Sequence, residues 1–317
     1  SIAGIATNIV NMVIFLKLGL EDSMSVGLLA LSFTDLSVTA IQLAGCSSYL
    51  VNVIYPESPI DPWSLGAFVF SWARYITYLI SCWITTMISA ERCFCVVSPF
   101  TVKRVFTKTR CVCVILTIYL VHFGIHLPIF LYAKMEWTRK AIAENTTILG
   151  RSVLTVVFND DSAMWEILSD LIAGVGLSVL SQVLLVVCTF CMTYSLKVSS
   201  RIRSNTSTVS GDSVSKLSDI ASRKPDHNLS DRERRLVKVV LFLAVILTVC
   251  NIPRFLTTAV HHILPGMNLG AYKNLDTLLW EVSYIFGTIC CTSNIVVYLQ
   301  LNSSYRKMFK KILFLDD

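Results

Sequence analysis

Charged residues are scarce in this sequence: they make up 15% of its 317 residues, whereas hydrophobic residues make up 54%. A soluble domain carries about 25% charged residues, so this composition excludes a fold solvated mainly by water. A helix needs about 20 mostly apolar residues to cross a bilayer. Such stretches occur at roughly 1–17, 26–51, 66–94, 111–132, 166–196, 236–262 and 276–300. We therefore expect an all-α membrane protein, a bundle of seven transmembrane helices. The first stretch is short and follows no Met, so we interpret the chain as N-terminally truncated.

Basic residues are missing from some connecting segments and abundant in others. None occurs in 52–65, whereas 103–110 holds four, 197–238 holds ten and the tail 301–317 holds four. Cytoplasmic loops carry an excess of Lys and Arg. The basic segments are therefore predicted to be cytoplasmic, which places the N-terminus outside the cell and the protein in the plasma membrane. The net charge of +6 follows from this bias and gives no reason to expect nucleic-acid binding.

Cysteine is absent from the predicted outer segments. All 11 cysteines lie within or at the edge of a span, and no CxxC pair has a partner at a spacing typical of zinc sites. We interpret them as small residues that pack between helices. His122 and His126 are one helical turn apart but have no apparent third ligand. The sequence therefore indicates neither a metal centre nor an enzyme.

Three polar residues lie within the predicted spans: Asp35, Arg92 and Asn294. Their contexts are L-S-F-T-D, E-R-C and N-I-V-V-Y. A charged group in the bilayer core is costly, so such a residue is by default a functional one. Three polar anchors on different helices favour a conformational switch over a simple membrane anchor.

The segments outside the spans carry their own signals. Residues 199–230 contain ten serines among basic residues and are predicted to form a disordered loop, either a phosphorylated one or a plain linker. Residues 301–317 place apolar and basic residues on opposite faces of a helix, which predicts an amphipathic helix on anionic lipid. Residues 1–300 would form the bundle. Asn145 begins an N-T-T sequon on the predicted outer side, so we expect glycosylation there.

These contexts and two further motifs resemble those of rhodopsin-like (class A) G-protein-coupled receptors. A G-x-x-x-N pattern opens the first span, and L-S-F-T-D resembles the second-helix L-A-x-A-D motif. E-R-C-F-C-V-V-S-P-F, ending in Pro99 and Phe100, is similar to the third-helix D-R-Y stretch. C-N-I-P, ending in Pro253, resembles C-W-x-P, and N-I-V-V-Y, ending in Tyr298, resembles N-P-x-x-Y. The motifs follow the family's order, one per span.

The resemblance implies a receptor that responds to an extracellular small molecule or peptide and activates a heterotrimeric G protein, with no catalytic activity. The residues in and around these motifs are most similar to those of invertebrate receptors, namely gastropod chemosensory and neuropeptide receptors. The alternative is a seven-helix transporter or channel, which would show inverted repeats or a chain of acids through the core. No repeat is apparent, and Asp35 is the only acid deep in a predicted span.

The resemblance also assigns residues to a mid-membrane cluster and a cytoplasmic switch. Asp35, Ser81 and Asn294 would meet as an oxygen cluster suited to Na⁺, or as a hydrogen-bonded helix contact without an ion. Glu233 would clamp Arg92 to the sixth helix until activation moves that helix outward. The residues expected to form the switch and the G-protein-coupling surface are Glu91, Arg92, Pro99, Phe100, Glu233, Pro253 and Tyr298.

The outer half of the bundle is expected to hold the ligand. Arg74 takes the position at which amine receptors carry Asp, and Arg254 follows Pro253. Two cations among aromatic rings favour an anionic or carboxylate-bearing ligand, although the two Arg residues could instead pair internally. The predicted ligand-binding residues are Arg74, Tyr75, Tyr78, Arg254, Trp280, Glu281 and Tyr284.

The sequence departs from the family pattern at several positions. Ala67 stands where the family has its third-helix Cys, and 133–165 contains no Cys. The usual disulfide is therefore absent, and the second outer loop is expected to be less constrained. Asn251 replaces the sixth-helix Trp, and Ile295 replaces the seventh-helix Pro. The outline of the switch remains, without its aromatic toggle.

Overall fold

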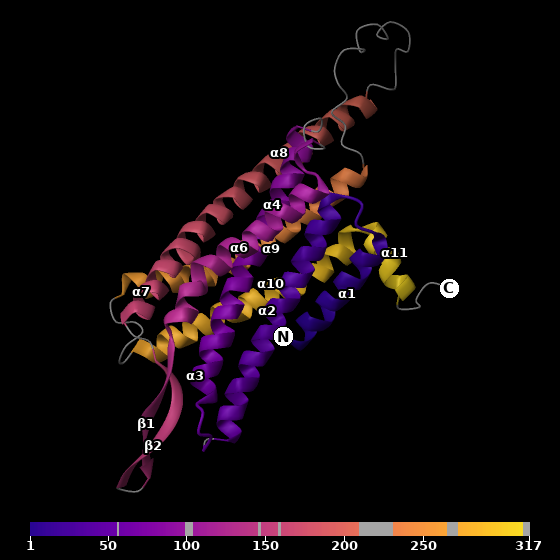
Figure 1. Ribbon diagram of the computed structural model, residues 1–317. Helices are drawn as coiled ribbons and strands as arrows, with labels where there is room; N and C mark the ends of the chain where they lie inside the picture. Colours follow the sequence, from indigo (N-terminus) through magenta and orange to yellow (C-terminus); the bar gives the residue numbers. More distant parts are fainter. Residues whose placement is uncertain are drawn as a thin grey trace, which may run out of the picture.

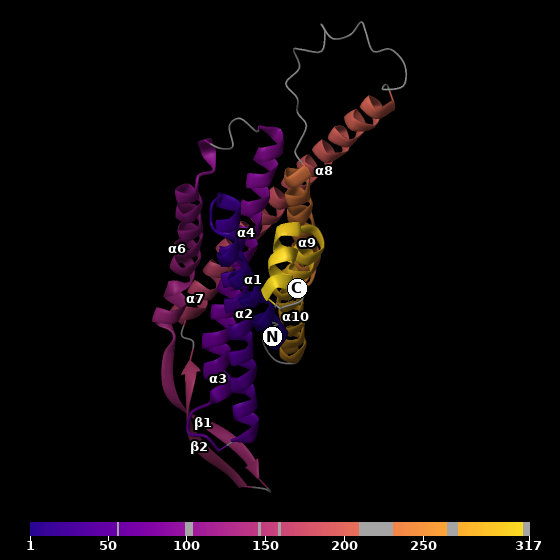
Figure 2. The ribbon, with the colours of Figure 1, turned by 90° about the vertical axis from the view of Figure 1, so that its right-hand side faces the viewer.

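Long helices lie side by side along most of the chain, and a β-hairpin projects beyond them at one end (Figures 1 and 2). The computed structural model describes residues 1–55, 57–98, 104–144, 147–157, 160–208, 231–264 and 272–312. The helices are α1 (Ile2–Leu18), α2 (Ser23–Ile54), α3 (Pro62–Gly66), α4 (Trp72–Val97), α6 (Lys108–Tyr132), α7 (Asp160–Ser169), α8 (Ser178–Thr208), α9 (Asp231–Ile263), α10 (Lys273–Leu301) and α11 (Ser303–Ile312). Two π-helical segments, η1 (Ala67–Ser71) and η2 (Asp170–Leu177), join α3 to α4 and α7 to α8.

Six of these helical stretches are long and apolar enough to cross a membrane, and the shorter α1 is apolar as well. Large apolar side chains such as Leu120 and Phe190 point outward, each 73% exposed, while polar residues such as Asn8 and Asp35 are buried. Lipid rather than water must therefore cover the outer surface, because apolar exposure on this scale is costly in water. This arrangement confirms the predicted all-α bundle of seven spans.

Small residues let the first helix approach its neighbours. A Cβ atom added at Gly4 would lie 2.6 Å from Oγ1 of Thr292 in α10 and 2.6 Å from Cγ2 of Thr39 in α2. Next to this contact, Asn8 donates from Nδ2 to the Cys291 carbonyl at 2.9 Å. The G-x-x-x-N pattern therefore places a close contact and a buried polar link on one face of α1.

The loop predicted to be the second outer one forms an antiparallel β-hairpin, β1 (Lys134–Glu144) with β2 (Thr147–Val157). Leu154 in β2 exchanges backbone hydrogen bonds of 2.9 Å with Pro59 and Asp61. The Ser64 hydroxyl of α3 accepts from the Val156 amide at 3.1 Å. The expectation of a less constrained loop is wrong here, because backbone pairing ties the hairpin to the start of the third span without a disulfide.

The cytoplasmic ends of the bundle differ in part from expectation. Helix α8 continues to Thr208, so the first ten residues of the predicted disordered segment 199–230 are helical. No Pro or Gly occurs between Ser178 and Gly211, which explains why the helix continues to Thr208. Residues 209–230 lie outside the described residues, as does Asn145. In α11, Tyr305 is buried and donates its hydroxyl to Asn11 Oδ1 at 2.6 Å.

Candidate ligand cavities and switch

The mid-membrane cluster joins three helices. Asp35 of α2 is 1% exposed and accepts from the Ser81 hydroxyl of α4 at 2.6 Å. Its second carboxylate oxygen accepts from Asn294 Nδ2 of α10 at 2.7 Å. The structure thus brings together the three residues that the sequence motifs paired, and each carboxylate oxygen is hydrogen-bonded.

The C-terminal end of α4 carries a buried ion pair. Arg92 Nη2 lies 2.7 Å from Glu91 Oε1, and the Ser23 hydroxyl donates to the same oxygen at 2.5 Å. Both charged side chains are at least nine-tenths buried by residue area. The side chain of Glu233 and residues Pro99 and Phe100 lie outside the described residues. The contact between Arg92 and Glu233 therefore stays a prediction, whereas the pair between Glu91 and Arg92 is present.

Aromatic rings surround the C-terminal end of α10. Tyr298 is fully buried, and its ring lies 5.2 Å from that of Phe15 and 5.4 Å from that of Tyr305. Its hydroxyl has no hydrogen-bond partner among the described residues. The ring packing holds Tyr298 of α10 against α1 and α11. Among the described residues, its hydroxyl would gain a partner only through rearrangement or water.

A polar chain occupies the place of the aromatic toggle. Asn251 Oδ1 accepts from the Tyr78 hydroxyl at 2.9 Å, and Asn251 Nδ2 donates to Gln182 Oε1 at 3.2 Å. Gln182 in turn donates to the Thr248 hydroxyl at 2.8 Å. These bonds link α4, α8 and α9 two residues before Pro253, which lies inside α9. Tyr78, predicted to touch the ligand, is instead part of this chain.

We expect the substitution Asn251→Ala to lower the free energy of unfolding by about 1–3 kcal/mol, because it leaves buried polar partners unsatisfied. The check is the melting temperature of the purified protein in detergent or nanodiscs. Tyr78→Phe should add little in the Asn251→Ala background, since the two residues act through one chain. Val249→Ala, on the exposed side of the same helix, is the matched control. Fully additive effects of the two substitutions would contradict the chain.

One cavity lies beside Arg74, in the half of the bundle predicted to face outward. It has a volume of about 340 Å³ between α2, η1, α4 and α10 and is also lined by Glu281 and Tyr284. Arg74 is 4% exposed, and its guanidinium carbon lies 3.3 Å from the centroid of the Tyr284 ring. Its Nη1 donates to the Tyr284 carbonyl at 3.5 Å, but its Nε has no partner among the described residues. A buried cation with spare donor capacity thus forms part of the cavity wall.

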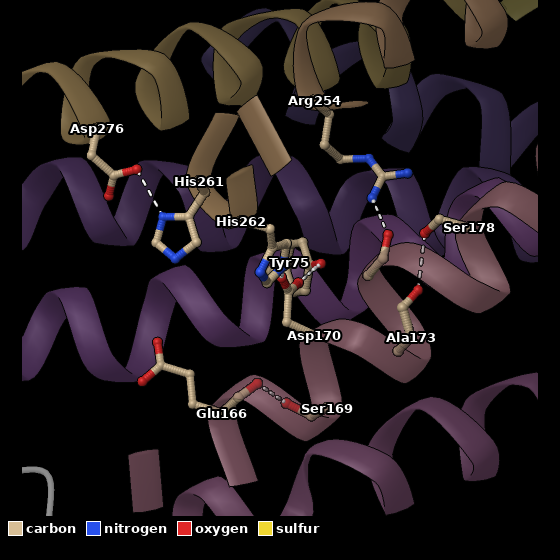
Figure 3. A network of polar contacts seen from close by, with 11 residues as sticks. Tyr75, Glu166, Ser169, Asp170, Ala173, Ser178, Arg254, His261, His262 and Asp276 are labelled. Carbon is tan, nitrogen blue, oxygen red and sulfur yellow. Dashed lines mark hydrogen bonds and ion pairs between the residues drawn. The ribbon is translucent and has the colours of Figure 1, made fainter. Parts of the chain in front are cut away.

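A second cavity, also about 340 Å³, adjoins the first and shares Ser71 and Tyr284 with it, and Figure 3 shows the polar residues around it. Asp170 of η2 accepts from the Tyr75 hydroxyl at 2.6 Å through Oδ1, and its Oδ2 lies 2.8 Å from His262 Nε2. His261 Nδ1 lies 2.9 Å from Asp276 Oδ1. The residues that line the cavity are Ser71, Trp72, Tyr75, Glu166, Ile167, Asp170, His261, His262, Asp276, Trp280 and Tyr284.

The sequence reasoning missed Asp170, a buried acid near the start of the predicted span 166–196. Asp170 is 9% exposed and starts a π-helical segment whose wider turn cannot be read from residue spacing. A Cβ atom at Gly174 would overlap Asp170 Oδ1 and the Tyr75 hydroxyl, so a glycine is needed for this contact. One available signal was Glu166, four residues earlier and on the same helical face.

The predicted ligand-binding residues are divided among three places. Arg74 and Glu281 line the first cavity, Tyr75 and Trp280 line the second, and Tyr284 lines both. Tyr78 and Arg254 line neither of these two cavities. Arg254 donates from Nη1 to the Gly174 carbonyl at 3.4 Å and is 4% exposed. The two Arg residues were predicted to share one ligand site, but the structure does not place Arg254 in the cavity that Arg74 lines.

The family model described as 7 transmembrane receptor (rhodopsin family) matches residues 8–298, which run from the first-helix Asn8 to Tyr298. The chain belongs to this family. No curated protein matches the sequence. The receptor is thus a multi-pass membrane protein of a signalling family whose members are not enzymes. Among the residues that the structure describes, no group of three or more His, Cys, Asp or Glu side chains is arranged to hold a metal ion.

Proposed function

We propose that the receptor detects an extracellular ligand that carries an acidic group and activates a heterotrimeric G protein. The observation that carries this proposal is Arg74, a buried cation in the wall of a cavity, whose Nε has no partner in the part of the chain that the structure describes. Arg binds carboxylates through paired, directional hydrogen bonds, and those bonds are strong where water is excluded. Glu281 also lines this cavity and offsets part of its positive charge.

The basic residues support the orientation that this function requires. The tail after α10 carries Arg306, Lys307, Lys310 and Lys311, all exposed on α11. Such a surface favours the inner leaflet, where anionic lipids are concentrated. We place α11 and the basic loops on the cytoplasmic side, where a G protein would bind, and the two cavities toward the outside. The cell membrane and an extracellular N-terminus belong to the same proposal. So does a glycan at Asn145.

The ligand proposal is tested by screening carboxylate-bearing compounds and peptides on cells that express the receptor, with calcium and cyclic AMP as readouts. Agonists with an acidic group are the expected result. A simple monoamine that activates the receptor at nanomolar concentration would contradict it, because like charges in a partly desolvated pocket cost several kcal/mol. The chemosensory and neuropeptide assignments would follow from the agonist found.

We also propose that the cluster around Asp35 binds Na⁺. A carboxylate, a hydroxyl and an amide carbonyl from three helices are oxygen ligands of the kind that hard cations prefer. Replacing choline chloride by NaCl should raise the melting temperature of the purified receptor, and Asp35→Asn should abolish the rise. Ser37→Ala, on the same helix but outside the cluster, should keep it. An equal effect of NaCl on the Asp35→Asn variant would refute the sodium site.

A further inference from the structure

The cavity beside Tyr75 has the opposite charge character from the cavity beside Arg74. Glu166, Asp170 and Asp276 contribute three carboxylates to its wall, and no Lys or Arg is among its lining residues. It shares Ser71 of η1 and Tyr284 of α10 with the Arg74 cavity, so the two are neighbours that meet at these residues. A cationic group and an anionic group of one ligand would therefore find complementary surroundings on the two sides.

The three carboxylates are not equally available. Both oxygens of Asp170 are occupied, one by the Tyr75 hydroxyl and the other by His262. One oxygen of Asp276 is held by His261. The half-buried Glu166 carboxylate makes no hydrogen bond or ion pair with the described side chains, and it extends from α7 toward His261 (Figure 3). Glu166 is thus the carboxylate with the most capacity for a ligand, since only one oxygen of Asp276 remains and none of Asp170.

Aromatic rings form the rest of the wall. The Tyr75 ring meets Trp72 at 5.8 Å and Trp280 at 6.1 Å, both edge to face. The centroid of the Trp280 ring in turn lies 6.0 Å from that of the Tyr284 ring. Ring faces attract organic cations, most strongly where water is displaced. The described residues hold no cluster suited to a metal ion, so a protonated amine is the cation that this cavity fits.

We propose that the two cavities together bind one small zwitterion, a dipeptide with both termini free. Its carboxylate pairs with Arg74, and its protonated amine pairs with Glu166 among the aromatic rings. Each cavity, at about 340 Å³, is at the lower end of the sizes that small ligands occupy. This assignment rests on the proposed function, because Arg74 supplies the anionic half of the site.

The test is a library of all dipeptides in three forms: free, N-acetylated and C-amidated. Activation is read as calcium and cyclic AMP in cells expressing the receptor. We expect some of the free compounds to activate the receptor. The potency of the same compounds should fall at least about tenfold when either end is capped, because a hydrogen bond to a charged group contributes roughly 1.5–3 kcal/mol. Equal potency of free and N-acetylated compounds overturns the zwitterion. Equal potency of free and C-amidated compounds overturns the proposed function as well.

Variants separate the two ends of the ligand. Glu166→Gln should remove the preference for the free over the N-acetylated form and keep the preference for the free over the C-amidated form. Arg74→Gln should do the reverse. Glu136→Gln and Arg139→Gln, both on the exposed β1 strand, are the matched controls and should keep both preferences. If Glu166→Gln lowers potency for all three forms equally, or if no form in the library activates the receptor at millimolar concentration, the inference is wrong.

Discussion

Arg74→Ala is expected to weaken any agonist with an acidic group by about thirtyfold or more. Removing one partner of a buried charge pair costs roughly 2–5 kcal/mol, and the lower figure already corresponds to that factor. The contact of Arg74 with the Tyr284 ring at 3.3 Å shows that the guanidinium is held in place before a ligand arrives. The measurement is the concentration of agonist that gives half-maximal calcium or cyclic AMP response, normalised to surface expression.

The control for this substitution is Arg139→Ala on β1, where an exposed Arg is removed from outside both cavities. It should leave potency unchanged. Glu281→Gln offers a second comparison, because loss of the carboxylate that partly neutralises Arg74 should increase the potency of the same agonists. Unchanged potency in Arg74→Ala would show that the acidic group binds elsewhere.

Glu91→Gln is expected to raise signalling in the absence of agonist several-fold. The Glu91 carboxylate holds Arg92 at 2.7 Å in a buried setting, and the amide keeps the shape of the side chain while removing its charge. Breaking a buried pair costs about 3–5 kcal/mol, so a state in which Arg92 has another partner gains population. Basal calcium and cyclic AMP levels at matched surface expression provide the measurement.

Glu21→Gln is the matched control for this effect, because it makes the same chemical change at an exposed position near the same end of the bundle. Its basal signalling should equal that of the unmodified receptor. A basal level in Glu91→Gln that does not differ from the control would mean that the buried pair does not restrain the receptor.

The parts of the site that sequence reasoning located are those tied to fixed offsets within single helices. Asp35, Ser81 and Asn294 lie within three separate spans, and the bundle brings them within hydrogen-bonding distance. Arg92 could be located in the same way, because its offset within one helix places it near the C-terminal end of α4. When a polar residue lies at a given depth in a span, few arrangements of the helices give it hydrogen-bond partners within the bilayer.

The parts that were missed depend on contacts between segments far apart in the sequence. Asp170 turns inward because of a π-helical segment and meets His262, 92 residues away. The hairpin was missed because its pairing with Asp61 and Ser64 is a tertiary contact, and isolated hairpins carry little stability of their own. Neither feature changes the apolar periodicity on which the span predictions rest.

The most direct test of the receptor assignment needs no agonist. Purified receptor in nanodiscs is mixed with purified heterotrimers of the Gs, Gi and Gq classes. The rate of nucleotide exchange is compared for the unmodified receptor, the Glu91→Gln variant and the double variant that also carries Arg92→Ala. The account predicts faster exchange with Glu91→Gln on at least one heterotrimer and loss of that gain when Arg92→Ala is added. Exchange rates equal to those of empty nanodiscs for every heterotrimer would contradict it.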